Sequence, residues 1–214
     1  MVDLIKKSHL ILALDVIRSD RVFEILETTY DLLDALKVGY PLLFSCGIDI
    51  CKRIKDKYGI PIIGDFKIAD VPITDKKLID LSVKNKIDFL TLYGFIGIDN
   101  LKKTKEYSDK NGINLFLMTE LTPGEIIFPY KKFARWAKEL GLYGVQAPAT
   151  KLIVLKEVKK IVGDSLKIIS CGIGAQGGIP KNAIKNGADF EIIGRYIYES
   201  KDPRKWISEY MNIN

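Results

Sequence analysis

The chain has 214 residues, of which 47% are hydrophobic and 28% charged, and its formal net charge is +6. These proportions are typical of a globular protein, and we expect one domain over residues 1–214. No uncharged apolar run approaches the roughly 18 residues needed to cross a bilayer, and the N-terminus lacks a signal-peptide cleavage site. The composition therefore predicts a cytoplasmic protein with no membrane partner.

The cysteine, histidine and lysine content excludes further classes of site and partner. Cys46, Cys51 and Cys171 are an odd number without C-x-x-C spacing, which disfavours a disulfide framework or a zinc site. A single histidine, His9, makes imidazole-based metal binding or acid/base catalysis a poor expectation. The isoelectric point is near 9.0, but the lysines are scattered along predicted helices. We therefore expect an anionic small molecule rather than nucleic acid as the partner.

Short apolar runs alternate with amphipathic stretches along the chain. The runs are each about five residues long and rich in Ile, Leu or Val, as strands buried on both faces are. The predicted strands are His9–Leu14, Ala35–Gly39, Pro61–Asp65, Phe89–Tyr93, Asn114–Thr119, Tyr143–Ala147, Lys167–Cys171 and Phe190–Gly194.

Helix signals lie between these strands. Apolar residues at i, i+3, i+4 and i+7 from Val22 predict a helix capped by Ser19, and a similar pattern around Leu155 predicts one behind Thr150. Glycines expected at helix C-termini precede four of the strands: Gly59, Gly112, Gly141 and Gly187.

The order of these elements predicts the fold class. The segments NKIDF (85–89) and NGADF (186–190) resemble each other, which indicates repeated βα units. Eight such units in about 210 residues make a compact (β/α)8 TIM barrel. An open doubly wound sheet is the alternative, but DVIRS (15–19) stands where its G-x-G-x-x-G motif should follow the first strand. The barrel is the predicted fold.

Polar residues interrupt the apolar pattern where the predicted strands end. Active sites of such barrels are built from the carboxyl ends of the strands and the loops that follow. Taken alone, Asp15 is typical of a turn and Lys37 of a surface lysine. The coincidence across six strands indicates a site, with these members: Asp15, Lys37, Asp65 with Lys67, Thr119–Thr122, Gly172–Gly178 and Arg195.

The segment D-F-K-I-A-D is the most informative of these. Residues i and i+2 of a strand point the same way, so Asp65 and Lys67 are expected to face one side together. Asp70 follows as the chain leaves the strand. A structural salt-bridge network is the alternative interpretation of this motif. With Lys37, however, four charges enter one barrel mouth, and such a costly arrangement is more often functional than stabilising.

A phosphate site is predicted after the last two strands. Residues 172–178 read G-I-G-A-Q-G-G, and Arg195 follows Gly194 at the end of the final strand. Phosphate in these barrels is held by backbone N–H groups and a helix N-terminus at these two loops. The glycine run alone could be a flexible turn, whereas the nearby arginine favours an anion.

Together these motifs resemble the orotidine 5′-phosphate decarboxylases, particularly the short archaeal-type enzymes. The matching segments occur in order along essentially the whole chain: LALD (12–15), KVGYP (37–41), DFKIADVPIT (65–74), YGF (93–95), GIGAQGG (172–178) and IGRYIY (193–198). D-x-K-x-x-D alone belongs to a wider superfamily, and its combination with Lys37, Gln176 and Arg195 is specific. The resemblance implies decarboxylation of orotidine 5′-phosphate to UMP without a cofactor or metal.

The resemblance also implies catalytic roles. Lys67 would protonate C6 of the pyrimidine after carbon dioxide leaves. Asp65 would lie beside the departing carboxylate, and Lys37 would pair with Asp65 and with the ribose. Asp70 and Thr74 would reach into the neighbouring subunit's site, which makes the enzyme a homodimer with shared sites.

The implied binding residues come from the other strand ends. Asp15 would bind a ribose hydroxyl and Thr122 the pyrimidine; the phosphate would be bound by Gly172, Gly174, Gln176, Gly194 and Arg195. The chain departs from the family pattern in three places. Tyr93 stands where many relatives carry His, Cys171 replaces a common Pro, and the loop around Thr122 is shorter than usual.

The predicted chemistry agrees with the residue types. Loss of carbon dioxide from a vinylic carbon leaves a carbanion, so positive charge is needed where negative charge develops. Lys67 between two carboxylates should stay protonated, which suits a proton donor and disfavours a Schiff base.

Two alternatives stay open. A metal-dependent sibling, such as a 3-hexulose-6-phosphate synthase or a keto-gulonate-phosphate decarboxylase, carries a glutamate ligand on strand two, where this chain has Lys37. A catalytically inactive nucleotide-binding barrel is the other, and the intact Asp–Lys–Asp set disfavours it.

Overall fold

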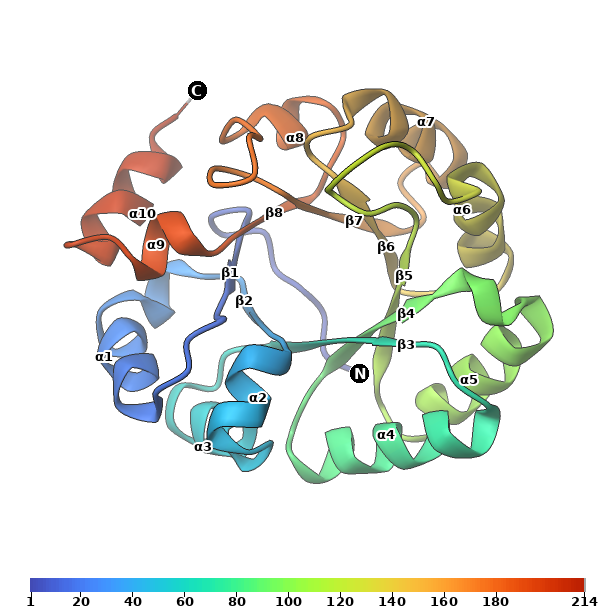
Figure 1. Ribbon diagram of the computed structural model, residues 1–214, viewed down its shortest axis with the longest axis horizontal. Helices are drawn as coiled ribbons and strands as arrows, with labels where there is room; N and C mark the ends of the chain where they lie inside the picture. The colour runs from blue at the N-terminus through green and yellow to red at the C-terminus, as the bar shows by residue number, and fades with distance from the viewer. Residues whose placement is uncertain (214) are drawn as a thin grey trace.

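The computed structural model describes residues 1–213 and contains a closed barrel of eight parallel strands with helices around it (Figure 1). Neighbouring strands pair in chain order, and the first pairs with the last to close the ring. This confirms the (β/α)8 prediction and excludes the open sheet. The strands are β1 (Leu10–Ala13), β2 (Ala35–Val38), β3 (Ile62–Ile68), β4 (Phe89–Tyr93), β5 (Asn114–Met118), β6 (Gly144–Pro148), β7 (Lys167–Cys171) and β8 (Phe190–Ile193).

The helices form the outer ring. They are α1 (Ser19–Thr29), α2 (Tyr40–Cys46), α3 (Asp49–Tyr58), α4 (Pro72–Lys84), α5 (Ile98–Lys110), α6 (Tyr130–Glu139), α7 (Leu152–Val162), α8 (Asn182–Lys185), α9 (Arg195–Tyr198) and α10 (Pro203–Met211), with 3-10 turns η1 (Tyr30–Leu32) and η2 (Gly94–Ile96). No helix within residues 1–213 has both the length and the apolar character needed to cross a membrane.

The predicted cap of α1 is wrong, whereas the second predicted helix does lie behind Thr150. The N-cap of α1 is Arg18 and that of α7 is Lys151, and neither helix has a side-chain cap. Ser19 already lies in the first turn of α1. The hydroxyl of Thr150 donates to the carbonyl of Thr122, 3.1 Å away, so this side chain makes a tertiary contact.

Strand boundaries agree with the prediction to within one residue, except at the end of β3. This strand was predicted to end at Asp65 and continues to Ile68. Its pairing with β4 shifts register between Gly64 and Ile68, which keeps the chain beside β4 for three residues more. Lys67 therefore belongs to an irregular part of the strand, where its φ is 49°.

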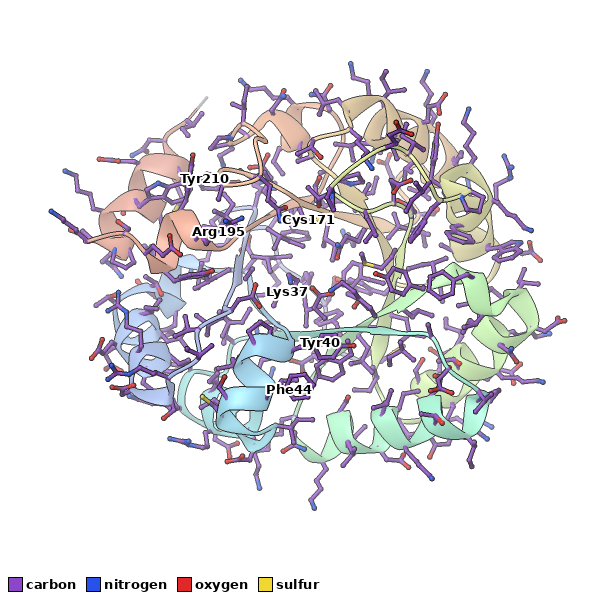
Figure 2. The ribbon with its side chains drawn as sticks, viewed as in Figure 1. Lys37, Tyr40, Phe44, Cys171, Arg195 and Tyr210 are labelled. Atoms are coloured by element: carbon purple, nitrogen blue, oxygen red, sulfur yellow. The ribbon has the colours of Figure 1, made fainter. Side chains whose placement is uncertain are left out.

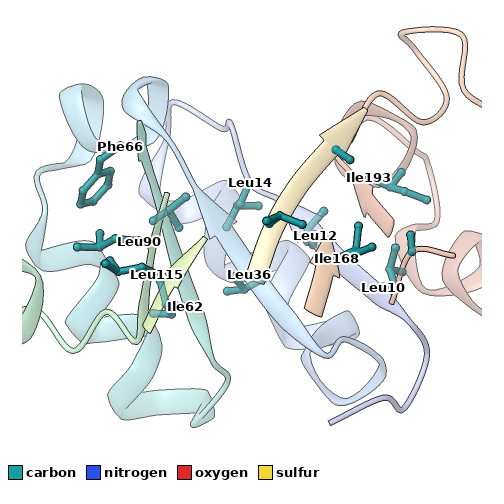
Figure 3. Packing of buried hydrophobic residues seen from close by; sticks show 14 of the residues in the cluster. Leu10, Leu12, Leu14, Leu36, Ile62, Phe66, Leu90, Leu115, Ile168 and Ile193 are labelled. Carbon is teal, nitrogen blue, oxygen red and sulfur yellow. The ribbon is translucent and has the colours of Figure 1, made fainter. Parts of the chain in front are cut away.

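Side chains alternate between the two faces of the barrel wall. One set points outward and packs against the helices, as Leu12, Leu36 and Ile62 do in Figure 3. The other set points into the barrel, where Phe89 and Phe116 pack together with ring centroids 5.8 Å apart. This inner cluster fills the barrel below the carboxyl ends of the strands, so the space for a ligand lies at those ends.

The two similar turns in the sequence have a common structural role. Asp88 and Asp189 each accept a hydrogen bond from a backbone N–H of the preceding strand, at Ile62 (2.8 Å) and Ile168 (2.7 Å). Asp34 binds the N–H of Leu10 in the same way, at 2.9 Å. These carboxylates satisfy backbone donors at the amino ends of β1, β3 and β7, which holds the barrel closed on the side opposite the cavity.

Candidate active site

A cavity of about 320 Å³ opens at the carboxyl ends of the strands. Figure 2 shows Lys37, Cys171 and Arg195 near the centre of the helix ring, around this mouth. Most of the predicted site residues line the cavity although they come from six different strands and the segments that follow them: Asp15, Lys37, Asp65, Lys67, Thr122, Gly172, Gln176, Gly194 and Arg195. The barrel closure brings them together, because all carboxyl ends of parallel strands lie at one rim.

One part of the cavity wall is an ionic triad of Lys37, Asp65 and Lys67. The ammonium of Lys37 pairs with Oδ2 of Asp65, and Nζ of Lys67 lies 2.9 Å from the same oxygen. The side chains of Lys37 and Asp65 are 9% and 7% exposed, and that of Lys67 is 31% exposed. Lys67 is therefore the member of the triad that a ligand can reach most easily.

The two ammonium groups set the charge state of the triad. Burial alone raises the pKa of Asp65, but Lys37 and Lys67 outweigh it and lower that pKa to about 2. Burial also disfavours the charged form of Lys37, yet the charges of Asp65 and Asp15 raise its pKa above the usual value. At neutral pH, Asp65 and Lys37 are therefore both ionised and paired.

The backbone around Lys67 is held by two residues that the sequence analysis missed. Thr91 on β4 accepts a hydrogen bond from the N–H of Lys67 at 3.0 Å and donates one to Oδ1 of Asp65 at 3.0 Å. Tyr40, at the start of α2, donates its hydroxyl proton to the carbonyl of Phe66. A threonine inside an otherwise apolar strand was the available signal for Thr91, since it shares the inward face with Phe89.

The loop of residues 172–178 forms the opposite wall. It closes on itself through hydrogen bonds from the N–H of Gly178 to the carbonyl of Gly172 (2.9 Å) and from the N–H of Gly174 to the carbonyl of Gly178 (2.8 Å). Gly172 and Gly174 have φ of 94° and 76°. A Cβ at Gly172 would lie 2.4 Å from Cγ2 of Thr122, so both the turn and the close approach require glycine there.

Arg195 lies beside this loop and carries a positive charge that no side chain of residues 1–213 pairs with. It is the first residue of α9, its side chain is exposed, and it lines the cavity. Within residues 1–213 its guanidinium makes no hydrogen bond or ion pair with another side chain. Gln176 is also exposed, at the tip of the glycine loop. The two side chains are therefore available to an anionic group in the cavity.

A third wall contains Thr122, Cys171 and Gln146. The hydroxyl of Thr122 and the thiol of Cys171 are 3.1 Å apart, and Nε2 of Gln146 donates to the same sulfur at 3.2 Å. Oε1 of Gln146 is buried, and no group of residues 1–213 donates a hydrogen bond to it. Burial raises the pKa of the Cys171 thiol, so the sulfur is a neutral hydrogen-bonding group. Sequence reasoning did not identify Gln146.

A family model described as orotidine 5′-phosphate decarboxylase / HUMPS matches residues 8–210. The chain belongs to this family. It is 39% identical over 204 residues to the orotidine 5′-phosphate decarboxylase of Methanosarcina mazei, a match that covers 94% of this chain and 92% of that protein. The relative from Methanocaldococcus jannaschii is 37% identical over 207 residues, which covers 94% of this chain and 96% of the relative.

Solved structures of the family have the same fold. The M. jannaschii orotidine 5′-monophosphate decarboxylase in complex with the inhibitor BMP matches with a TM-score of 0.85 and 34% identity, covering 94% of this chain and 96% of that one. The Sulfolobus solfataricus decarboxylase matches with a TM-score of 0.86 and 28% identity, covering 95% and 96% of the two chains. Members of the decarboxylase family therefore share this barrel over nearly their full length.

Three predicted site residues of this family member lie outside the cavity. Asp70 is exposed at the turn before α4, where its carboxylate accepts from the N–H of Val71 at 2.6 Å. Thr74 is half-buried in the first turn of α4, and Gly174 belongs to the glycine loop but does not line the cavity, because it approaches the ring of Tyr196. The structure of one chain therefore does not bring Asp70 or Thr74 to its own triad.

Tyr93, the last residue of β4, is close enough to the triad to feel the charge of Asp65. Tyr93 stacks on Phe95 with ring centroids 4.7 Å apart. Burial, and then the negative charge of Asp65, raise the pKa of the Tyr93 hydroxyl. The end of β4 is therefore occupied by a neutral aromatic group.

Proposed function

We propose that the protein converts orotidine 5′-phosphate to uridine 5′-phosphate by cofactor-free decarboxylation, with Lys67 as the proton donor. The observation that carries this proposal is the triad, in which one buried carboxylate, Asp65, is held between two ammonium groups at the wall of a cavity. The two relatives described above are named orotidine 5′-phosphate decarboxylases, which supports the same substrate.

The triad suits this reaction at each step. The substrate carboxylate lies beside the negative charge of Asp65, and this repulsion is relieved when carbon dioxide leaves. The C6–carboxylate bond breaks and its electron pair stays on C6, where the ammonium of Lys67 faces it. One such charge about 4 Å away contributes on the order of 4 kcal/mol at an effective dielectric constant near 20. Lys67 then gives a proton to C6 and regains one from solvent.

The other cavity walls suit the rest of the substrate. Arg195 and Gln176 bind the phosphate together with backbone N–H groups of the glycine loop, because these exposed side chains have no competing anion in the described chain. Asp15 binds a ribose hydroxyl opposite Lys37, which also reaches the ribose. Thr122 binds the pyrimidine ring.

The proposed enzyme is a homodimer in which Asp70 and Thr74 complete the partner's site. Support comes from their placement on the exposed turn and first helical turn beside Val71 and Ile73, apolar side chains that are 56% and 62% exposed. Mixed refolding of Lys67→Ala and Asp70→Ala chains should then regenerate activity, because a hybrid dimer contains one site with both residues intact. Verified hybrids without activity would rule out shared sites.

A direct assay tests the activity. Purified protein is mixed with orotidine 5′-phosphate and the loss of orotidylate absorbance is followed, with uridine 5′-phosphate measured as the product. We expect turnover by the unmodified chain and almost none by Lys67→Ala. If the unmodified, folded chain binds the nucleotide without converting it, the inactive-barrel alternative replaces the proposal.

A further inference from the structure

Thr91 on β4 lies beside the part of β3 where the regular pairing of the two strands is interrupted. Between Gly64 and Ile68 the pairing of β3 with β4 is interrupted, and Lys67 adopts a left-handed conformation with φ of 49°. A lysine rarely adopts this region of backbone space, so it needs support from its surroundings. Thr91 is fully buried on the neighbouring strand and provides that support through a single hydroxyl group.

The hydroxyl of Thr91 binds both ends of the Asp65–Lys67 unit. It accepts from the N–H of Lys67 at 3.0 Å, replacing a ladder partner that the register shift removes. It donates its own proton to Oδ1 of Asp65, also at 3.0 Å. Lys37 and Lys67 both bind the other oxygen, Oδ2. Among the side chains of residues 1–213, only Thr91 donates a hydrogen bond to Oδ1.

We propose that Thr91 is a positioning residue that fixes the Asp65 carboxylate plane and the Lys67 backbone relative to each other. The two ammonium groups bind one oxygen of the carboxylate, and the hydrogen bond from Thr91 anchors the other oxygen to β4, so the three contacts together fix the rotation about the Cβ–Cγ bond. Because the same hydroxyl binds the N–H of Lys67, it also fixes the backbone position from which the Lys67 side chain extends. Thr91 does not line the cavity, so its effect reaches the substrate only through these two residues.

This role rests on Lys67 being the proton donor of the proposed function, and it predicts a particular kinetic pattern. Thr91→Val keeps the shape and the β-branched side chain but removes the hydroxyl. Misplacement of a catalytic group by a fraction of an ångström lowers the rate of the chemical step more than substrate affinity. We therefore expect kcat to fall roughly 10- to 100-fold while KM changes less than about twofold.

Three further measurements separate positioning from simple structural support. Thr91→Ser keeps the hydroxyl and should restore most of kcat. Thr29→Val is the matched control, because Thr29 is a buried threonine on α1 whose hydroxyl donates to the carbonyl of Ile25, at 2.7 Å. It should lower the melting temperature without changing kcat. If Thr91→Val does not fold, Thr91→Ser and Thr91→Ala, which differ only by the hydroxyl, replace the comparison.

The outcomes are distinct. A large kcat loss in Thr91→Val that Thr91→Ser reverses supports positioning. An unchanged kcat with a melting temperature lowered as in Thr29→Val would overturn the role and leave Thr91 as a core residue. A loss carried entirely by KM would overturn it too, since it would mean that Thr91 shapes the binding cavity. Absence of turnover in the unmodified chain is a different result, which refutes the proposed function itself.

Discussion

The two sides of the barrel mouth are charged in different ways. On the side of β2 and β3, Lys37, Asp65 and Lys67 are buried and already paired with one another. On the side of β7 and β8, Arg195 is exposed and has no side-chain partner within residues 1–213, beside a glycine loop that is closed by its own backbone. The charges on the β2–β3 side are therefore paired without a ligand, whereas Arg195 on the β7–β8 side gains an anionic partner only when a ligand binds.

This difference assigns separate tasks to the two sides. A preformed ion cluster needs no rearrangement when charge develops in the reaction, so it is suited to stabilising a transition state. An unpaired cation gains a partner only when an anionic ligand arrives, so it is suited to supplying binding energy. The comparison predicts that substitutions on the β2–β3 side change kcat. Substitutions on the β7–β8 side should change how much the phosphate of the substrate contributes to kcat/KM.

The largest effect is expected for Lys67→Ala. Removing its charge costs on the order of 4 kcal/mol of transition-state stabilisation, which is roughly a thousandfold in kcat. Lys37 still pairs with Asp65, so the fold should survive. Lys52→Ala, an exposed lysine on α3, is the control and should keep full activity. A kcat for Lys67→Ala within tenfold of the unmodified chain would remove Lys67 from the proton-donor role.

Arg195→Ala tests the other side. We expect kcat/KM for orotidine 5′-phosphate to fall by about 3 kcal/mol, roughly 100-fold, because a charge-assisted pair with the phosphate is lost. Turnover of orotidine, which has no phosphate and should be a very poor substrate, should barely change. Equal losses on the two substrates would show that Arg195 supports the fold or the chemistry, and the contrast between the two sides would fail.

The paired side should also contribute to stability in a pH-dependent way. The pKa of Asp65 is about 2 in the folded chain and about 3.9 in an unfolded one, so its contribution is present above pH 4 and is lost as the pH falls toward 2. The free energy of unfolding should therefore drop by about 2 kcal/mol more in the unmodified chain than in Asp65→Asn between pH 5 and pH 2. Denaturant titrations at both pH values measure this. An equal drop in the free energy of unfolding for the two proteins would mean that Asp65 is not held ionised by its neighbours.

The smallest effect is expected for metal removal. Lys37 occupies the strand-two position at which the metal-dependent siblings carry an acidic ligand, and its ammonium would repel a divalent cation. Within residues 1–213, no group of three or more His, Cys, Asp or Glu side chains is arranged to hold a metal ion. Exhaustive EDTA treatment should leave the decarboxylation rate unchanged. A loss of activity that Mg²⁺ restores would favour the sibling enzymes.

Much of the fold could be predicted from local patterns. Eight short apolar runs and glycine-terminated helices determine the βα repeat, because burial on both faces removes the polar alternation of an antiparallel sheet with one solvated face. The placement of Asp65 and Lys67 near Lys37 also followed from the sequence, since strand ends of a parallel barrel meet at one rim. The contact between Asp65 and Lys67 was predicted from a regular strand, whereas the chain achieves it through a register shift.

Only the tertiary structure decided the contacts between distant segments. The contacts of Thr91 and Gln146 depend on which side chain stands opposite them on a neighbouring strand, and one sequence does not carry that information. The same holds for Thr150, whose hydroxyl binds the loop of Thr122 rather than a helix end. Local periodicity determines which residues face inward, and barrel closure determines what they meet there, because each inward position borders two strands that are distant in sequence.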